Sequence, residues 1–372
     1  MVMDPPVRND RWVCPRGRLH IYPGRASPTP GRKGDTDSMS NVLWLSRADV
    51  ARTGVCRMEE TVQIVEKAFR LFDAEQAIIV QEAALRLKAD GQDHACYSLP
   101  AYVGGDVNIC GLKWTAHGTE TDPLNMEQSR IQATVVLTDP HSGLPLAVMN
   151  GTDIGAARTG AVTAAALRRL APVHTKKVAL CGAGGQAERQ LQAVLFALPQ
   201  TEEIAVWSRG NRRNKALTER YRGTTGTVLR AAQDLDDAVD GADVIIGATS
   251  APEPYLLPRH LRSAALYCHI GFNEITAEAV DQFSRVVVDT WEEAKHVSGQ
   301  SLFRLYREGR FDEARITGTL GAILSGRLDV PRGTPGQKVM FDAFGLPIFD
   351  LSVAKEAFVR AGQMGLGTSL TW

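Results

Sequence analysis

The chain of 372 residues has no excess charge of either sign, because 42 lysines and arginines balance 42 aspartates and glutamates. A neutral chain gives no electrostatic reason to expect nucleic acid or an anionic membrane as a partner. It also lacks any run of about 18 uncharged apolar residues, which argues against a membrane-spanning helix. With 44% hydrophobic residues, the composition predicts a globular protein, and its length favours two domains.

Cysteine is scarce and scattered, with six residues at positions 14, 56, 96, 110, 181 and 268. None forms a CxxC pair or has metal-ligand spacing with histidine, so no metal site is expected. In a chain of this length such cysteines indicate reduced, mostly buried thiols. We therefore expect a cytoplasmic protein.

The first 38 residues differ from the rest, with several prolines and arginines and almost no apolar periodicity. Such composition favours disorder, and the segment has no continuous apolar region of a secretory signal. We expect residues 1–38 to be a disordered leader, with the folded part beginning at Met39.

The next part of the sequence predicts an α+β region with hairpin connections. An apolar stripe at positions 62, 65, 68, 69, 71 and 72 predicts a helix over 58–77. Strands are expected at 83–87, 95–99, 108–114, 132–138 and 146–150. A helix rich in alanine follows over 156–170.

From Lys176 the pattern changes to short apolar strands that alternate with helical stretches, which predicts a Rossmann-type doubly wound parallel sheet. The expected strands are 178–181, 204–207, 227–230, 244–249, 265–271 and 285–289. A strand at 339–341 and a helix at 351–364 then close the chain. We predict a nucleotide-binding domain over 161–334, inserted in a substrate domain formed by 39–160 and 335–372.

The strand at 178–181 runs into a glycine-rich loop, Gly182-x-Gly184-Gly185-Gln186-Ala187, which opens a helix. The first glycine allows a tight turn, the second lets the backbone approach a pyrophosphate, and the small Ala187 lets helix and strand pack closely. Amides at the helix N-terminus then face the phosphates. This loop predicts a bound nicotinamide dinucleotide.

The end of the second expected strand distinguishes NAD from NADP, because a carboxylate there would bind the ribose 2′-hydroxyl. The chain has Ser208, Arg209 and Arg213 in this turn and no carboxylate. A hydroxyl and guanidinium groups suit a 2′-phosphate, so the sequence favours NADP, with NAD as the alternative.

Ligands of a doubly wound sheet lie beyond the carboxyl ends of its strands. Thr249 and Ser250 end the fourth expected strand, and Gly271 follows the fifth. We expect these residues to line the ribose and nicotinamide side of the cofactor.

The sequence resembles the ornithine cyclodeaminase and mu-crystallin family of amino-acid oxidoreductases in five segments. They are 99–102 (Leu-Pro-Ala-Tyr), 111–114 (Gly-Leu-Lys-Trp), 157–161 (Ala-Arg-Thr-Gly-Ala), the glycine loop at 182–186, and 341–350 (Phe-Asp-Ala-Phe-Gly-Leu-Pro-Ile-Phe-Asp). The resemblance implies dimers joined through the substrate domain. It also implies hydride transfer between the nicotinamide and Cα of an amino acid or imino acid.

The resemblance further implies roles for basic residues. Arg86 and Arg158 match the family's carboxylate-binding arginines, and a guanidinium fork suits that group. Lys113 matches the active-site lysine, which can exchange a proton with an imine. Lys88, two residues from Arg86 on the same strand face, is a rival for its role. Thr159, beside Arg158, is an expected cofactor contact.

One departure from the family concerns Asn273, because cyclodeaminases have an aspartate after the fifth Rossmann strand. An amide cannot take up a proton at neutral pH, which argues against ornithine cyclisation. We expect Asn273 to lie at the catalytic site, and Glu274 is the alternative carboxylate.

Three functions remain open from the sequence. The first is an NAD(P)-dependent oxidoreductase that acts on a C–N bond. It either oxidises an N-substituted amino acid whose imine is then hydrolysed, as in the family branch that makes 2,3-diaminopropionate, or reduces a ketimine, as mu-crystallin-like reductases do. The second is an ornithine or lysine cyclodeaminase with recycled NAD. The third is a nucleotide-binding sensor, against which Lys113 and Arg158 argue.

Overall fold

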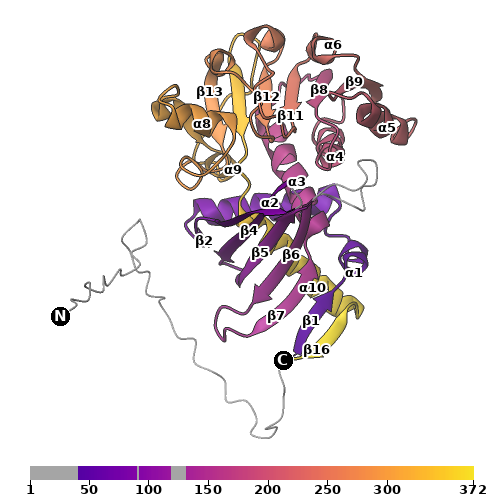
Figure 1. The fold of residues 1–372 in the computed structure, drawn as a ribbon, viewed down its shortest axis with the longest axis vertical. Helices are drawn as coiled ribbons and strands as arrows, with labels where there is room; N and C mark the ends of the chain where they lie inside the picture. The colour runs from indigo at the N-terminus through magenta and orange to yellow at the C-terminus, as the bar shows by residue number, and fades with distance from the viewer. Residues whose placement is uncertain (1–40, 90–91, 119–130) are drawn as a thin grey trace, which may run out of the picture. The chain divides into compact units, whose positions relative to one another are not determined.

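Two sheets of eight strands each organise the chain (Figure 1). The structure, a computed structural model, describes residues 41–89, 92–118 and 131–372. The leader expected over residues 1–38 lies outside this range. Each predicted strand and helix from residue 58 onward has a counterpart, with shifted ends.

The first sheet is antiparallel except for one parallel pair, β1 with β7. Its order is β16-β1-β7-β6-β5-β4-β2, with β3 paired to β4. The strands are β1 (Asn41–Leu45), β2 (Ala77–Ile79), β3 (Ala83–Ala89), β4 (Gln92–Val103), β5 (Ile109–His117), β6 (Ile131–Thr138), β7 (Pro145–Asn150) and β16 (Thr368–Thr371).

The second sheet is parallel throughout, in the order β10-β9-β8-β11-β12-β15-β13-β14. Its strands are β8 (Lys177–Cys181), β9 (Glu203–Trp207), β10 (Val228–Ala231), β11 (Val244–Gly247), β12 (Leu266–His269), β13 (Phe283–Val288), β14 (Ile316–Thr319) and β15 (Lys338–Asp342). The strand order reverses direction between β8 and β11. That is the switch point where a doubly wound sheet binds ligands, and it confirms the predicted fold class.

Helices connect and cover the sheets. They are α1 (Arg47–Arg52), α2 (Met58–Asp73), α3 (Thr152–Leu170), α4 (Ala187–Ala197), α5 (Arg212–Arg220), α6 (Leu235–Val239), α7 (Ala277–Val280), α8 (Ser301–Arg307), α9 (Leu320–Leu324) and α10 (Pro347–Met364), with 3-10 turns at Pro258–Leu261 and Glu313–Arg315. Helix α10 packs against β4, β5 and β6, and α3 contacts both α2 and α4. None of these described helices is long and apolar enough to cross a membrane.

The predicted domain boundary at residue 335 is wrong for one strand. β15 was expected with the first sheet, but it lies between β12 and β13 of the second. Its five residues are all buried, as a central parallel strand requires. The rest of the C-terminal segment joins the first sheet, because β16 pairs with β1. The division into two domains remains a prediction, since residues from 40 onward form one compact unit.

Candidate active site

A buried cluster of three charges lies between the first sheet and helix α10. Lys113 Nζ lies 2.9 Å from Asp350 Oδ2, and Arg158 Nε lies 3.3 Å from the same carboxylate. The Lys113 and Asp350 side chains are 7% and 0% exposed, and that of Arg158 is 11% exposed. Three chain segments far apart in sequence thus share one ionic network.

The local sequence explains how these residues reach one another. Lys113 lies on the central strand β5, paired with Leu99 and Val135, so its side chain points to the face that α10 covers. Pro347 at the first position of α10 starts the helix. Asp350 follows in the first turn, where the helix dipole stabilises a carboxylate.

Burial lowers the pKa of Lys113, while the Asp350 carboxylate opposes the shift and the Arg158 guanidinium adds to it. The lysine therefore loses its proton more readily than a lysine in water. A lysine with a lowered pKa is better suited than a free lysine to exchange a proton with a bound substrate.

Strand β3 brings a guanidinium to the same face of the sheet, and the carboxylate of Glu82 directly precedes this strand. The register pairs Arg86 with Ala95 and Ala95 with His117, which places Arg86 on the face of Lys113. Lys88 follows two residues along, and both side chains are exposed. Burial raises the pKa of Glu82, and the charges of Lys113 and Arg86 oppose that shift. Glu82 therefore lies within the electrostatic reach of both cations.

The glycine loop has the geometry of a phosphate cradle. Gly182 has φ +129°, and a Cβ there would lie 2.5 Å from Ala248 O, so only glycine fits. A Cβ at Gly184 would meet nothing within 4 Å, and Gly185 is exposed. The loop thus packs tightly at its first glycine and is open at the next two.

Two buried polar atoms near the loop have no partner among the described residues. They are Oε1 of Gln186, the residue that precedes helix α4, and Oγ of Ser208, which follows β9. Buried polar groups are rarely left unsatisfied. Both atoms therefore fit contacts from a bound dinucleotide.

The turn after β9 is fixed by Asn214, whose amide donates to Val206 O and Ala232 O, each at 3.2 Å. Asn211 adopts a left-handed conformation with φ 46°. Arg209 is exposed and Arg213 is half-buried in the first turn of α5. Guanidinium groups are thus present at the end of the second strand.

The fourth and fifth strands end in a network around Glu274, which is fully buried. Its Oε1 accepts hydrogen bonds from Thr249 N, Thr249 Oγ1 and the Tyr255 hydroxyl, and its Oε2 accepts one from Tyr267. A Cβ at Gly271 would lie 2.3 Å from Thr249 O, so the two loops touch. Glu274 therefore joins the two loops from a buried position in the connection after β12.

The remaining predicted residues of this region take different positions. Asn273 is 7% exposed, and its amide donates to Pro252 O at 2.7 Å. Ser250 is exposed. The Thr159 hydroxyl donates to Gly155 O at 2.9 Å within its own helix.

Below these loops, His269 bridges β12 and β15. Its Nδ1 lies 2.6 Å from Asp342 Oδ2, and its Nε2 lies 2.8 Å from Phe272 O. Burial opposes the charged form, but the Asp342 and Glu274 carboxylates outweigh burial and raise the pKa of His269. Since both ring nitrogens face acceptors, the geometry suits the doubly protonated imidazolium.

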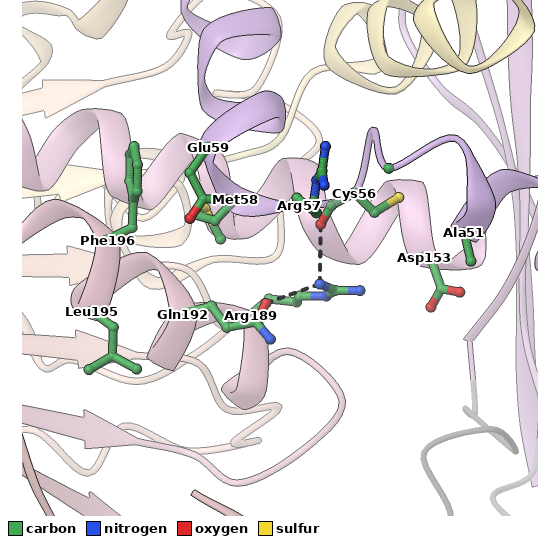
Figure 2. Close-up of a pocket in the computed structure, with 11 residues that line it drawn as sticks. Ala51, Cys56, Arg57, Met58, Glu59, Asp153, Arg189, Gln192, Leu195 and Phe196 are labelled. Carbon is green, nitrogen blue, oxygen red and sulfur yellow. Dashed lines mark hydrogen bonds between the residues drawn. The ribbon is translucent and has the colours of Figure 1, made fainter. Parts of the chain in front are cut away.

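A pocket of about 510 Å³ has none of the predicted site residues in its lining; Figure 2 shows the residues that line it. It lies among the α1–α2 connection, the start of α3 and helix α4. The Arg189 guanidinium points into it and bonds Cys56 O and the Gln192 side chain. Burial raises the pKa of the Cys56 thiol to about 11, so this sulfur is not an activated nucleophile.

The sequence did not identify Asp350 or Glu82 as part of the site. Asp350 stands at the end of the 341–350 signature, which was the available signal. Its contacts join positions 237 and 192 residues apart, which no local pattern encodes.

Comparison with known proteins identifies a family for this chain. Residues 43–363 match the model of the ornithine cyclodeaminase/mu-crystallin family. N-((2S)-2-amino-2-carboxyethyl)-L-glutamate dehydrogenase of Staphylococcus aureus is 25% identical over 334 residues, which cover 88% of this chain and 98% of that protein. A Δ(1)-pyrroline-2-carboxylate reductase of Bacillus cereus is 25% identical, with 83% of this chain and 94% of the relative covered.

Among solved structures, a Δ(1)-pyrroline-2-carboxylate reductase of Thermococcus litoralis, in complex with NADH and L-proline, has a TM-score of 0.79. It is 27% identical, and the match covers 88% of this chain and all of that one. Sequence and fold thus lead to the same group of proteins.

Proposed function

The chain belongs to the ornithine cyclodeaminase/mu-crystallin family, and we propose that Lys113, Arg158 and Asp350 form the site at which it interconverts an amino acid and its imine. The chain is an NAD(P)-dependent oxidoreductase that acts on the C–N bond of an amino acid, as its relatives are dehydrogenases and reductases of such compounds. The observation that carries the site assignment is the buried ionic cluster in which Asp350 contacts both cations.

Each residue has a defined task in this proposal. Arg158 binds the substrate α-carboxylate, and Arg86 on the same sheet face is the second candidate for that contact. Lys113 donates a proton to the substrate nitrogen when an imine is reduced, and accepts it when an amine is oxidised. Asp350 fixes both cations. The nicotinamide, when bound, supplies or accepts the hydride at Cα.

Two classes of substrate fit this chemistry. An N-substituted amino acid would be oxidised to an imine that water hydrolyses, in the manner of the diaminopropionate branch. A cyclic ketimine would instead be reduced to a cyclic amino acid. Both reactions need the same two groups from the chain. One binds the substrate carboxylate, and the other donates or accepts a proton at the substrate nitrogen.

Cyclodeamination fits the site less well, because no carboxylate is available after β12. Asn273 is an amide that bonds Pro252 O. Both oxygens of Glu274 are engaged by the surrounding hydroxyls and backbone. Glu274 therefore cannot take the place of the family's aspartate without losing these bonds.

For the cofactor we propose NADP in preference to NAD. The support is the unpartnered, buried Ser208 hydroxyl, together with Arg209 and Arg213 in the same turn. Replacing Arg209 by alanine should weaken NADPH binding about tenfold, the effect of losing a hydrogen bond to a charged group, and leave NADH binding unchanged. Arg222→Ala, an exposed arginine paired with Glu219 outside the turn, is the matched control. If Arg209→Ala leaves the ratio of NADPH affinity to NADH affinity unchanged, the NADP assignment is wrong.

We also propose a homodimer formed through the outer face of the first sheet. The register places Trp44, Trp114, Leu85 and Leu87 on one face, opposite Lys113. These four side chains are 40–54% exposed, and apolar patches of this kind mark interaction sites. Trp114→Glu should give monomers in light scattering, and retention of the dimer would contradict the proposed surface.

The function is tested by following the absorbance of reduced nicotinamide. The probes are N-((2S)-2-amino-2-carboxyethyl)-L-glutamate with NADP⁺ and Δ(1)-pyrroline-2-carboxylate with NADPH. A stoichiometric change in nicotinamide with either compound is the expected result, and Lys113→Met should remove it. Ammonia release from ornithine with no net change in nicotinamide would overturn the proposal in favour of a lyase.

A further inference from the structure

The loop at 343–346 joins the second sheet to helix α10, and so to the proposed amino-acid site. It follows β15 directly and ends at Pro347, the first residue of α10. Asp350 lies four residues beyond the loop. The position of Asp350, and with it that of Arg158 and Lys113, therefore depends on how this loop is held.

Asp289, at the end of β13, holds the middle of the loop. Its Oδ1 accepts the Phe344 amide at 3.0 Å, and its Oδ2 accepts the Gly345 amide at 2.7 Å. The carboxylate is 1% exposed, and Oδ1 also accepts the Thr290 amide at 2.7 Å. Three hydrogen bonds to one buried carboxylate make a strong and directional contact.

Other contacts to the loop come from the same side. Ala343 N donates to His269 O at 3.0 Å, and the Gln300 amide donates to Ala343 O at 2.9 Å. Every one of these partners belongs to the second sheet or to its connections. Hydrogen bonds thus hold the loop to the second sheet and its connections before the chain enters helix α10.

The far side of the loop touches the substrate-site arginine. Gly345 has φ +93°, and a Cβ there would lie 2.6 Å from Arg158 Nη1. The Arg158 guanidinium therefore packs against the backbone of Gly345. This is the same residue whose amide donates a hydrogen bond to Asp289. Any shift of Gly345 moves the surface against which Arg158 rests.

We infer that Asp289 is a positioning residue for the amino-acid site, acting through Phe344 and Gly345 on Arg158 and Asp350. It touches neither substrate nor cofactor in this role. It aligns the carboxylate anchor with the sheet that carries the nucleotide, so that the two reactants meet in one geometry. The inference rests on the proposed function of Arg158 and deepens it.

Asp289→Asn is the first test, because the amide is nearly isosteric and cannot accept both loop amides. We expect KM for the amino-acid substrate to rise about tenfold, the change for one lost hydrogen bond to a charged group, with KM for the nicotinamide nucleotide unchanged. Hydrogen exchange of the 343–350 segment should become faster.

Val286→Ala is the matched control, since Val286 is a buried residue of the same strand and makes no hydrogen bond to the loop. It should lower the melting temperature without changing the ratio of the two KM values or the exchange of 343–350. The inference is overturned if Asp289→Asn behaves like this control in both readouts.

If Asp289→Asn does not fold, Gly345→Ala provides a second test of the inference. It presses directly on Arg158 and should raise the amino-acid KM in the same way, and an unchanged KM would contradict the inference. If the wild-type enzyme turns over none of the substrates, the proposed function has failed. Hydrogen exchange of residues 343–350 in Asp289→Asn then still tests whether the hydrogen bonds to Asp289 keep the loop in place.

Discussion

Lys113 Nζ lies 2.9 Å from Asp350 Oδ2, although 237 residues separate them in the chain. Both side chains are buried, that of Lys113 on β5 and that of Asp350 on α10. Arg158 shares the same carboxylate, so Asp350 is the only carboxylate within ion-pair distance of these two buried cations among the described residues. Its removal should affect the site more than removal of either cation.

Asp350→Asn should lower the free energy of unfolding by about 3–5 kcal/mol, since it leaves buried charges without a partner. Lys113→Met should cost less, because the Arg158–Asp350 pair survives. Urea denaturation measures both. Asp106→Asn, which breaks an exposed pair with Lys67, should change stability by at most about 1 kcal/mol. An Asp350→Asn protein as stable as the Asp106 control would show that the cluster contributes little.

The rate of catalysis should depend on pH through Lys113, whose pKa is lowered by burial. In imine reduction the lysine acts as an acid, so kcat/KM should fall as pH rises through its pKa. In amine oxidation it acts as a base, so the rate should rise over the same range. Lys113→Arg should remove this inflection, because a guanidinium stays protonated. Profiles with the same slope in both directions would contradict the assignment.

Two glycines of the cofactor loop should respond differently to alanine. Gly182→Ala forces a side chain against Ala248 O at φ +129° and should lower stability by about 2–4 kcal/mol. Gly184→Ala has open space, so the protein should fold normally yet bind NADPH at least about tenfold more weakly, because Cβ blocks the approach of the pyrophosphate. Thermal melts and nucleotide titrations separate the two effects. Tight NADPH binding by Gly184→Ala would contradict the phosphate cradle.

Ionisation of Asp289 should make the free energy of unfolding depend on pH. Burial raises the pKa of this carboxyl from 3.8 to about 7, and Asp342 on β15, which His269 on β12 contacts, adds to the shift. Between these values the folded protein holds a proton that the unfolded chain has lost, so this contribution to stability falls as pH rises to about 7. The Asp289→Asn variant should lack this slope in denaturation curves at about pH 5 and about pH 8.

Binding of the amino acid should improve over the pH range in which this contribution to stability is lost. Only the ionised carboxylate accepts all three amides, so KM should fall as pH rises through about 7. An identical pH profile of KM in wild type and Asp289→Asn would contradict the role of Asp289 in positioning the amino-acid site.

Much of the fold could be predicted because it follows from local periodicity. The short apolar strands from Lys176 onward and the glycine loop at 182–186 encode a parallel sheet with a tight glycine turn after β8, and the structure contains both. The insertion of β15 between β12 and β13 was not predicted, because strand order depends on packing across the sheet and not on the sequence of the strand.

The site was predicted only in part, for a similar reason. Lys113 and Arg158 could be named because they match the active-site lysine and a carboxylate-binding arginine of the family that the sequence resembles. Their shared carboxylate could not, since Asp350 reads locally as an ordinary residue of a helix start. Asp289 likewise gains its role from two amides more than fifty residues away.

The placement of β15 has a consequence for how the protein is made. Strand β15 completes the second sheet, while α10 and β16 complete the first, and all three lie within residues 338–371. During synthesis this stretch leaves the ribosome after every strand with which it pairs. Neither sheet can therefore be complete until this stretch has emerged, and a chain truncated before it would expose apolar edges of both sheets.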